Sequence, residues 1–416
     1  MSAPNSDPKL DFTEFYNVVD GKLESTEETR HSLNPSTLEK NPPVPVSTQT
    51  DVDRAVQAAK VAAESWAAVP YKERQKAVAR FADGLETLKG IFVLMLTREQ
   101  GKPLQVAHCE LDVSIQFLRG YSLLPELDEV AEDKPGRRII TRYTPLGVLQ
   151  ALSGNDDLGP WLAAHPGIDK VSFTGSTATG KRVMQSCAAT LKRVTLELGG
   201  NDPAIVCSDV DVKAIAPKVG DGPRRIYIHE SIYDELLKEL VAEVNKLHVA
   251  DGMENGAMLG PVQNQLQFDR VKELLADIES QKLNLATGST GASTLSQGYF
   301  IIPTVVDNPP DDSRIVVEEP FGPVFPVLKW KDEEEVLRRA NDSPMGLGAS
   351  VWTRNIEQGE KMAKKLKAGT VWINTHLELQ PNIPFGGHKQ SGVGAEHGVE
   401  GIRSYCNTQA VFVTEA

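Results

Sequence analysis

The sequence predicts an α/β protein built around a largely parallel sheet. From about residue 149 onward, short apolar segments alternate with longer segments of helical periodicity, which is typical of repeated strand–helix units. The chain has 416 residues, enough for two or three domains. Its composition, 40% hydrophobic and 24% charged, is that of a globular protein with a sizeable core.

The first 148 residues are predicted to form an extended arm, four helices and a β segment. Residues 1–50 are polar and rich in proline, serine and threonine, which indicates an arm with turns. A capping-box pattern at Thr50 and Asp53 precedes apolar residues at helical spacing. Residues 125–137 are charged and contain two prolines, so we expect a connector, followed by β structure over 138–148. The expected helices cover residues 51–68, 71–89, 91–100 and 104–124.

The remaining chain is predicted to alternate between strands and helices. The expected strands cover residues 149–153, 170–174, 193–197, 225–229, 304–306, 324–330, 349–352 and 370–374. The expected helices cover residues 176–189, 234–247, 263–280, 333–341 and 356–366. No internal repeat is visible in this pattern.

Charge and cysteine content exclude several classes of protein. The net charge is −13, whereas a nucleic-acid binder needs a basic surface, so we expect no nucleic-acid partner. The four cysteines are far apart and form neither a metal-ligand spacing nor a disulfide framework. The polar N-terminus resembles no secretory signal, and no apolar run is long enough to span a membrane. We therefore expect a cytoplasmic protein without a metal site or a membrane partner.

The segment 170–182 is a candidate anion site. A predicted strand runs into the small residues after Thr174 and then into a helix, whose first amides and positive end attract anions. The segment nearly matches the phosphate-loop pattern G-x-x-x-x-G-K-[ST], but Arg182 stands where a hydroxyl would bind Mg²⁺. Taken alone, the pattern fits a tight strand-to-helix turn equally well.

Three further segments carry chemically useful residues. Glu197 ends an apolar strand before two glycines, which is a suitable place for a general base with a raised pKa, although a solvated carboxylate at a strand end is the commoner outcome. The segments 318–323 and 384–392 each place a phenylalanine among glycines and prolines. Each of these two is a turn when taken alone, and His388 is expected to be exposed.

The order of these four segments is more specific than any one of them. FTGS at 173–176, ELGG at 197–200, EEPFGP at 318–323 and PFGGxKxSG at 384–392 resemble the aldehyde dehydrogenase superfamily over nearly the whole chain. The resemblance implies a Rossmann-like cofactor domain, a second α/β catalytic domain and a small β element for oligomerisation. The corresponding ranges are 1–126 with 149–200, 201–400, and 127–148 with 401–416.

The resemblance also implies a reaction and its residues. Members of the family oxidise aldehydes with NAD or NADP through a cysteine nucleophile, a side-chain amide that holds the oxyanion and a glutamate that activates water. Gly175 and Ser176 would contact the pyrophosphate side of the cofactor, Glu319 would hold the nicotinamide ribose, and Phe321 would lie beside the nicotinamide ring. Glu197 matches the water-activating glutamate. A small aldehyde as substrate and a homo-oligomeric state are implied in the same way.

Two segments of the family pattern are missing from this sequence. At the position after Val148, family members continue into a PWNFP-like motif with the oxyanion asparagine, then a helix and a strand whose lysine holds the adenosine ribose. In this chain Val148 is followed directly by residues 149–154, which resemble family sequence from well downstream. Between Val219 and Arg224 the family carries its nucleophilic cysteine, whereas this chain has only Gly-Asp-Gly-Pro. The first strand and helix of the nucleotide-binding unit are therefore expected to be lost, which argues against cofactor binding.

The resemblance also implies that Asn374 and the 384–392 segment would flank the substrate side. None of the four cysteines replaces the missing nucleophile. Cys109 and Cys187 fall within expected helices, Cys207 follows the ELGG segment, and Cys406 is close to the C-terminus. Three interpretations follow: a family member without dehydrogenase activity, an active enzyme whose true chain includes both segments, or a non-catalytic binding or assembly partner of an intact relative.

Overall fold

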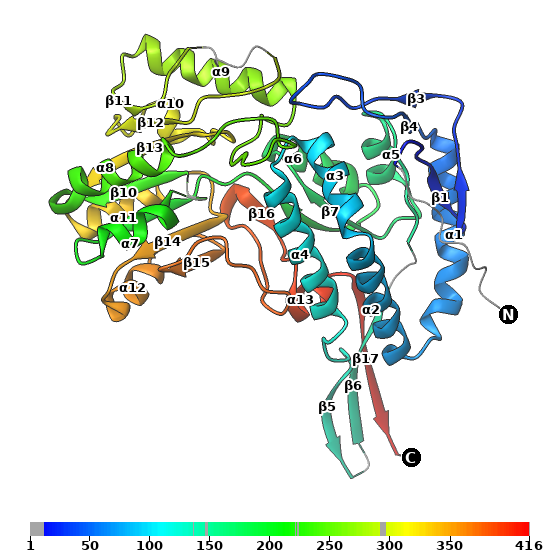
Figure 1. Ribbon diagram of the computed structural model, residues 1–416. Helices are drawn as coiled ribbons and strands as arrows, with labels where there is room; N and C mark the ends of the chain where they lie inside the picture. The colour runs from blue at the N-terminus through cyan, green and yellow to red at the C-terminus, as the bar shows by residue number, and fades with distance from the viewer. Residues whose placement is uncertain are drawn as a thin grey trace.

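A computed structural model describes residues 12–135, 137–145, 149–220, 222, 224–291 and 297–415. Four helices follow a short N-terminal arm; the second, third and fourth pack together, whereas the first packs beside α5 (Leu158–Ala164) and β1 (Asn17–Val19) (Figure 1). The arm contributes the strand pairs β1 (Asn17–Val19) with β2 (Lys22–Glu24) and β3 (Thr29–Arg30) with β4 (Val44–Pro45). The helices are α1 (Gln49–Ala67), α2 (Tyr71–Thr87), α3 (Lys89–Gln100) and α4 (Leu104–Tyr121), so all four predicted helices are confirmed.

The first helix begins two residues earlier than its sequence pattern suggests. The side chain of Thr48 accepts a hydrogen bond from the Asp51 amide at 3.3 Å, and the Asp51 carboxylate accepts one from the Thr48 amide at 2.8 Å. This reciprocal pair is a capping box, which satisfies two helix-end donors. The expected box at Thr50 and Asp53 was therefore wrong: both threonine–aspartate pairs have the required three-residue spacing, so the spacing alone does not distinguish them.

A small sheet of three strands follows the helices. Its order is β16–β8–β7, with β7 (Lys170–Thr174) parallel to β8 (Arg193–Glu197) and β16 (Gly392–Val393) antiparallel to β8. The helices α5 (Leu158–Ala164) and α6 (Thr177–Ala188) pack with each other beside it. The predicted strand 149–153 is wrong: Ala151 makes only an isolated bridge to Val18. Within the described chain, β7 is thus the edge strand of this sheet.

The larger sheet has seven strands in the order β11–β12–β13–β10–β9–β14–β15. All of its pairings are parallel except that between β11 and β12, so the predicted parallel α/β architecture is confirmed. The strands are β9 (Pro203–Val206), β10 (Arg225–His229), β11 (Leu285–Thr287), β12 (Thr304–Asp307), β13 (Val324–Trp330), β14 (Gly348–Trp352) and β15 (Thr370–Ile373). Its helices are α7 (Val212–Val219), α8 (Tyr233–Val244), α9 (Gln265–Ser280), α10 (Arg314–Val317), α11 (Glu333–Asn341) and α12 (Ile356–Ala363), with 3-10 turns at Glu230–Ile232 and Lys389–Ser391.

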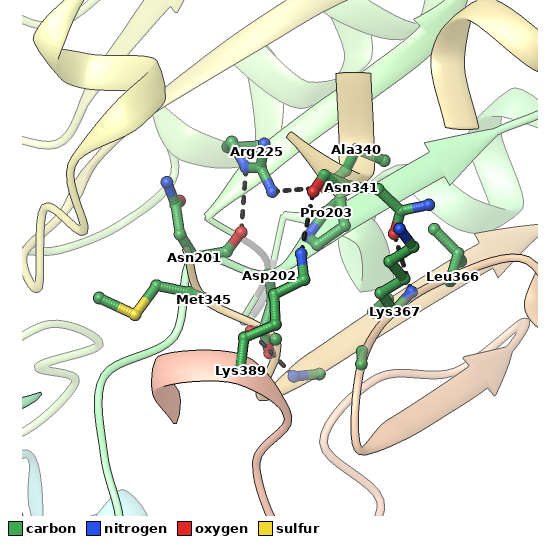
Figure 2. A pocket seen from close by; sticks show the side chains of 14 residues that line it. Asn201, Asp202, Pro203, Arg225, Ala340, Asn341, Met345, Leu366, Lys367 and Lys389 are labelled. Carbon is green, nitrogen blue, oxygen red and sulfur yellow. Dashed lines mark hydrogen bonds between the residues drawn. The ribbon is translucent and has the colours of Figure 1, made fainter. Parts of the chain in front are cut away.

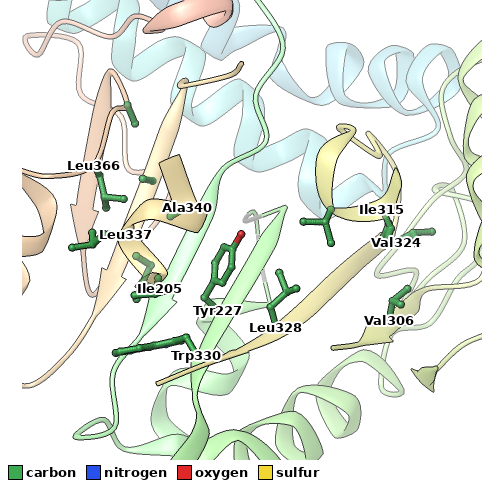
Figure 3. Close-up of a cluster of buried hydrophobic side chains, with 14 of the residues drawn as sticks. Ile205, Tyr227, Val306, Ile315, Val324, Leu328, Trp330, Leu337, Ala340 and Leu366 are labelled. Carbon is green, nitrogen blue, oxygen red and sulfur yellow. The ribbon is translucent and has the colours of Figure 1, made fainter. Parts of the chain in front are cut away.

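The two faces of the seven-stranded sheet form two separate hydrophobic clusters. Successive strand residues point to opposite faces, so Tyr227 belongs to one cluster whereas Ile226 and Ile228 belong to the other. Helices α9, α10, α11 and α12 cover the first face, part of which Figure 3 shows, and α7 and α8 cover the second. This sheet is therefore buried on both sides, as parallel sheets generally are.

A third sheet projects from the body as an arm (Figure 1). It joins β5 (Glu129–Lys134), β6 (Arg137–Pro145) and β17 (Cys406–Thr414) in antiparallel pairs, and the short helix α13 (Gly398–Ser404) leads into β17. The expected connector at 125–137 was wrong in part, because its charged segment Glu129–Lys134 forms strand β5, which pairs with β6. Residues 146–148, which complete the predicted β segment, lie outside the described residues, as do residues 292–296 of the Ser/Thr/Gly-rich stretch at 288–298.

Candidate functional site

A cavity of about 720 Å³ lies where the three-stranded sheet meets the seven-stranded sheet. Its walls come from the end of β7, the turn between β8 and β9, helices α9 and α10, and the loop that follows α10. Ligand sites of α/β proteins commonly lie at the carboxyl ends of parallel strands, and the volume falls in the usual range for small-molecule pockets.

The turn after β7 brings Gly175 and Ser176 to the cavity wall. The Gly175 amide donates to the Glu197 carbonyl at 3.0 Å, and a Cβ on Gly175 would lie 2.5 Å from the Phe173 ring. Only glycine therefore fits this turn without a shift. Ser176 is the N-cap of α6 and accepts from the Thr179 amide at 3.2 Å, so the positive end of the helix faces the cavity.

Glu319 reaches the same cavity from the opposite side. Its carboxylate accepts a hydrogen bond from the Gly200 backbone and lies so near Gly199 that a Cβ there would be 2.8 Å from Oε2. Burial raises the pKa of Glu319, and the Arg224 guanidinium opposes that rise. The approach of this carboxylate thus leaves no room for a side chain at Gly199, while a Cβ on Gly200 would meet Asp202 and Leu347, each at 2.9 Å.

Phe321 completes the group of predicted cofactor residues on the cavity wall. Its backbone is left-handed, with φ of 45°, and Gln267 of α9 donates to the carbonyls of Pro320 at 3.2 Å and Phe321 at 3.3 Å. The guanidinium of Arg224 lies 5.8 Å from the ring centroid. The structure therefore brings Gly175, Ser176, Glu319 and Phe321 to one cavity from two distant segments of the chain.

Glu197 lies at the end of β8, but its carboxylate is not part of the described cavity wall. The residue is 8% exposed, and both carboxylate oxygens are buried without a hydrogen-bond partner among the described residues. Burial raises its pKa to about 7, and the negative charge of Glu396 adds to that rise. The expected raised pKa is thus present, while a role as general base stays a prediction.

Three groups near the cavity were not identified from the sequence. Glu396 accepts a hydrogen bond from Ser172 of β7. His376 has both ring nitrogens buried without a described partner, and its Nε2 lies 3.9 Å from the Asp202 carboxylate. Burial, assisted by Arg224, lowers the pKa of His376 to about 4, so the ring is neutral at pH 7. No local sequence signal marks these residues, because tertiary packing alone brings them to this region.

None of the four cysteines lines the cavity. Cys187 donates to the Ala163 carbonyl at 3.8 Å, Cys207 lies 3.9 Å from the Met362 sulfur, and Cys406 donates to the Ile402 carbonyl at 3.4 Å. Burial raises the pKa of each of these thiols, that of Cys207 to about 12. Cys109 is exposed on α4. The environments of Cys187, Cys207 and Cys406 disfavour the thiolate, which is the nucleophilic form of cysteine.

The residues expected on the substrate side have structural partners. The Asn374 amide accepts from the Thr353 amide at 2.9 Å and donates to the Thr353 carbonyl at 2.8 Å, so it joins the ends of β14 and β15. In the 384–392 segment, Ser391 donates to the Gly199 carbonyl at 2.6 Å and thereby ties the segment to the ELGG turn. His388 is exposed, as predicted, and Lys181 donates to the side chain of Gln390 at 2.9 Å.

A second, much smaller cavity lies under the ELGG turn (Figure 2). Arg225 is 2% exposed and donates to the carbonyls of Asn201 at 2.9 Å and Ala340 at 3.0 Å. Lys389 donates to the Asn341 carbonyl at 2.9 Å. The free volume is about 10 Å³, room for one water at most. This region is a structural junction between β10, α11 and the 384–392 segment.

Among the residues that the structure describes, no group of three His, Cys, Asp or Glu side chains is arranged to hold a metal ion. In the same part of the chain, no helix is long and apolar enough to cross a membrane.

Comparison with known proteins gives consistent matches. The family model described as "Aldehyde dehydrogenase family" matches residues 22–154 and again 143–411. A Fusarium protein named aldehyde dehydrogenase LUC3 is 35% identical and covers 97% of this chain and 100% of its own length. A putative aldehyde dehydrogenase, FUS7 of Gibberella fujikuroi, is 34% identical with the same coverage.

Solved structures match the fold closely. The NAD⁺ complex of aldehyde dehydrogenase from Bacillus cereus superposes with a TM-score of 0.91 at 30% identity, covering 97% of each chain. Betaine aldehyde dehydrogenase from Staphylococcus aureus, also in complex with NAD⁺, gives 0.90 at 25% identity, covering 96% of this chain and 94% of its own.

Proposed function

Because the chain belongs to the aldehyde dehydrogenase family, we propose that it keeps the family scaffold but, as written, does not oxidise aldehydes. The observation that carries the proposal is the cavity wall, which contains neither a cysteine nor an asparagine among the described residues. Without a thiolate no covalent adduct forms with the carbonyl, and Glu197 has no thioester to hydrolyse. Loss of one oxyanion donor alone typically costs about 10²–10³ in rate.

The family cofactor fits this chain only in part. Gly175, Ser176, Glu319 and Phe321 line one cavity, which suits a phosphate, a ribose and a flat ring. However, no described residue before Thr174 contributes to the wall, and β7 is the edge of its sheet. The adenosine half of NAD or NADP therefore lacks a binding surface, and we assign no hydride-transfer step to this chain.

Purified full-length chain should be tested for NADH and NADPH formation with a panel of small aldehydes. We expect no signal above that of the protein-free reaction, with the Fusarium relative as the positive control. Turnover that scales with the concentration of this chain would refute the proposal.

A second candidate is an active dehydrogenase whose true chain includes both missing segments. Two observations favour it. The two matches to the family model overlap at residues 143–154, so the sequence around Val148 resembles two separate parts of the family pattern. The alignment to the Fusarium relative spans 465 positions, more than the 416 residues of this chain. Full-length transcript sequencing separates the candidates: a message encoding these 416 residues would exclude the second.

A third candidate is a non-catalytic partner of an intact relative. The complete arm of β5, β6 and β17 supports it, because it keeps the strands through which we propose that the chain oligomerises. The proposed division is a truncated cofactor domain at 1–126 and 149–200, a catalytic-type domain at 201–400 and oligomerisation strands at 127–148 and 401–416, in a cytoplasmic homo-oligomer. Co-purification of the tagged chain with an active relative would favour this candidate, and a homogeneous assembly of this chain alone would exclude it.

A further inference from the structure

We propose that Asn255 is a site of spontaneous modification, at which the side chain cyclises onto the Gly256 amide and is converted to aspartate or isoaspartate. Asn255 is the one asparagine in the sequence that is followed by a glycine. Asparagine is among the chemically labile residues of proteins, and a following glycine has no side chain to obstruct its own amide nitrogen. The inference is independent of the proposed function, because neither residue lines the large cavity.

Asn255 and Gly256 form the centre of a tight turn between α8 and α9. The Ala257 amide donates to the Glu254 carbonyl at 3.2 Å, which closes the turn. Gly256 has a φ of 84°, whereas the φ of Asn255 is not positive. This combination defines a type II turn, whose third position favours glycine. The hydrogen bond that closes the turn uses neither the side chain of Asn255 nor the amide of Gly256.

Both reacting groups are accessible. No described residue hydrogen-bonds the side chain of Asn255, and none accepts a hydrogen bond from the Gly256 amide. Both residues are exposed, and a Cβ built on Gly256 would meet no atom within 4 Å. Water therefore reaches the two groups, and no neighbouring side chain has to move when the ring closes.

The residues around the turn fix its position on the surface. Nδ1 of His248 lies 3.2 Å from the Gly256 carbonyl oxygen, and Nε2 of the same ring lies 3.5 Å from the Glu254 carboxylate. At the base of the loop, the Leu104 amide donates to the Gly252 carbonyl at 3.1 Å and ties the loop to the start of α4. The folded chain therefore presents the turn to water, and the reaction needs no prior unfolding.

The reaction consumes one water and releases one ammonia. The Gly256 nitrogen loses its proton to the solvent and attacks Cγ of Asn255, so that a carbon–nitrogen bond forms and the side-chain nitrogen leaves as ammonia. Water then opens the succinimide ring at one of its two carbonyls. Opening at the side-chain carbonyl gives aspartate, whereas opening at the main-chain carbonyl gives isoaspartate, whose backbone is longer by one methylene. Either product adds a negative charge to a chain whose net charge is −13.

Incubation of the folded full-length chain at pH 8, followed by peptide mass spectrometry, tests the inference. We expect aspartate and isoaspartate at Asn255 to form at least about tenfold faster than an acid forms at Asn264. Asn264 is a matched internal control, since it is also exposed, but its side chain accepts from the Gln267 amide at 2.9 Å and Gln265 follows it. An Asn255 that stays unmodified, or that reacts no faster than Asn264, would overturn the inference.

Two variants locate the reaction. Isoaspartate is measured by methyl transfer from S-adenosylmethionine to its free carboxylate, with a protein isoaspartate methyltransferase as the reagent. Asn255→Gln should abolish this signal, because the longer side chain would have to close a larger ring, whereas Asn264→Gln should leave it unchanged. A signal that persists in Asn255→Gln would place the reaction at another residue and overturn the assignment. Aspartate at position 255 without isoaspartate would show direct hydrolysis and overturn the cyclisation.

Discussion

The two halves of the molecule differ sharply in packing. All residues of both hydrophobic clusters lie between Ala204 and Val371, around the seven-stranded sheet. Helix α8 buries four of its 12 residues there, whereas α1 buries only two of 19. Large apolar side chains remain exposed in the N-terminal half, including Val61, Phe81 and Leu123. The half that carries the seven-stranded sheet therefore contains the more extensive buried core among the described residues.

We propose that this difference is connected with the first segment that the sequence is expected to lack. A strand and a helix inserted after Val148 would extend the sheet beyond β7 and cover apolar surface of the N-terminal helices. About five buried side chains at roughly 2 kcal/mol each come to ~10 kcal/mol, which is the size of the net stability of a whole domain. The large cavity lies between the two halves. The wall formed by α9 packs against the buried core of the seven-stranded sheet, whereas the wall formed by the end of β7 belongs to the edge strand of the small sheet.

The largest expected effect is a difference in local stability. In native-state hydrogen exchange, amides of α2 and α4 should exchange at least about 100-fold faster than those of α8 and α9, because they are protected by fewer buried contacts. Mass spectrometry of peptides from each helix measures this directly. Equal protection of amides in both halves would contradict the inferred difference in local stability. A chain with both segments restored from the Fusarium relative is the control and should slow exchange in α2 and α4.

A substitution within the packed half should cost more than its exposed counterpart on the same helix. Leu274→Ala removes a side chain that is 3% exposed and packed in a cluster, so it should lower the free energy of unfolding by about 3 kcal/mol. Leu266→Ala, at a position 65% exposed on the same helix, should change it by less than about 0.5 kcal/mol. Urea unfolding of both variants tests the pair, and similar costs would contradict the packing described for α9.

The sequence predicted the packed half more completely than the other. Its strands and helices have strong periodicity and short connections, and helices α8, α9, α11 and α12 all lie within a few residues of their predicted ranges. In the other half, β5 depends on pairing with β6, and 149–153 forms only a bridge. Neither outcome is visible locally, because a distant segment decides whether the backbone finds a hydrogen-bonding partner.

The same limit applies to the site. The structure brings Gly175, Ser176, Glu319 and Phe321 to one cavity, whereas their roles toward a cofactor stay a prediction. The sequence did not show that the Asn374 side chain hydrogen-bonds the backbone of Thr353, because side-chain partners depend on tertiary packing. Whether the Glu197 carboxylate acts on a substrate stays a prediction.

The start of β10, in the packed half, offers a matched pair of neighbouring arginines. Arg225 is buried and donates to two carbonyls, so Arg225→Met should lower the free energy of unfolding by about 2–3 kcal/mol by leaving buried acceptors unpaired. Arg224→Met, at the partly exposed cavity wall, should cost less than about 1 kcal/mol. Thermal unfolding of both variants measures the difference, and a costlier Arg224 variant would contradict the assignment of the larger structural role to the buried arginine.

The smallest expected effect is a pH dependence of the free energy of unfolding that comes from Glu197. The pKa of Glu197 is raised to about 7 from its ordinary value of 4.5, mainly by burial. Between these two values the folded state binds more protons than the unfolded state, so this residue lowers stability as pH rises through that window. At pH 8 the free energy of unfolding of Glu197→Gln should therefore exceed that of the parent chain by on the order of 2 kcal/mol, and near pH 4 the two should be equal. Urea unfolding at both pH values measures the difference.

Glu396 provides the control for this titration, because it is the charged neighbour that adds to the rise. Glu396→Gln should lower the pKa of Glu197 and shrink the pH-dependent difference without removing it, since burial is the larger cause. A difference between Glu197→Gln and the parent that stays the same at pH 4 and pH 8 would show that the carboxylate is solvated. In that case the end of β8 would be open to water, in contrast to the buried strands of the seven-stranded sheet.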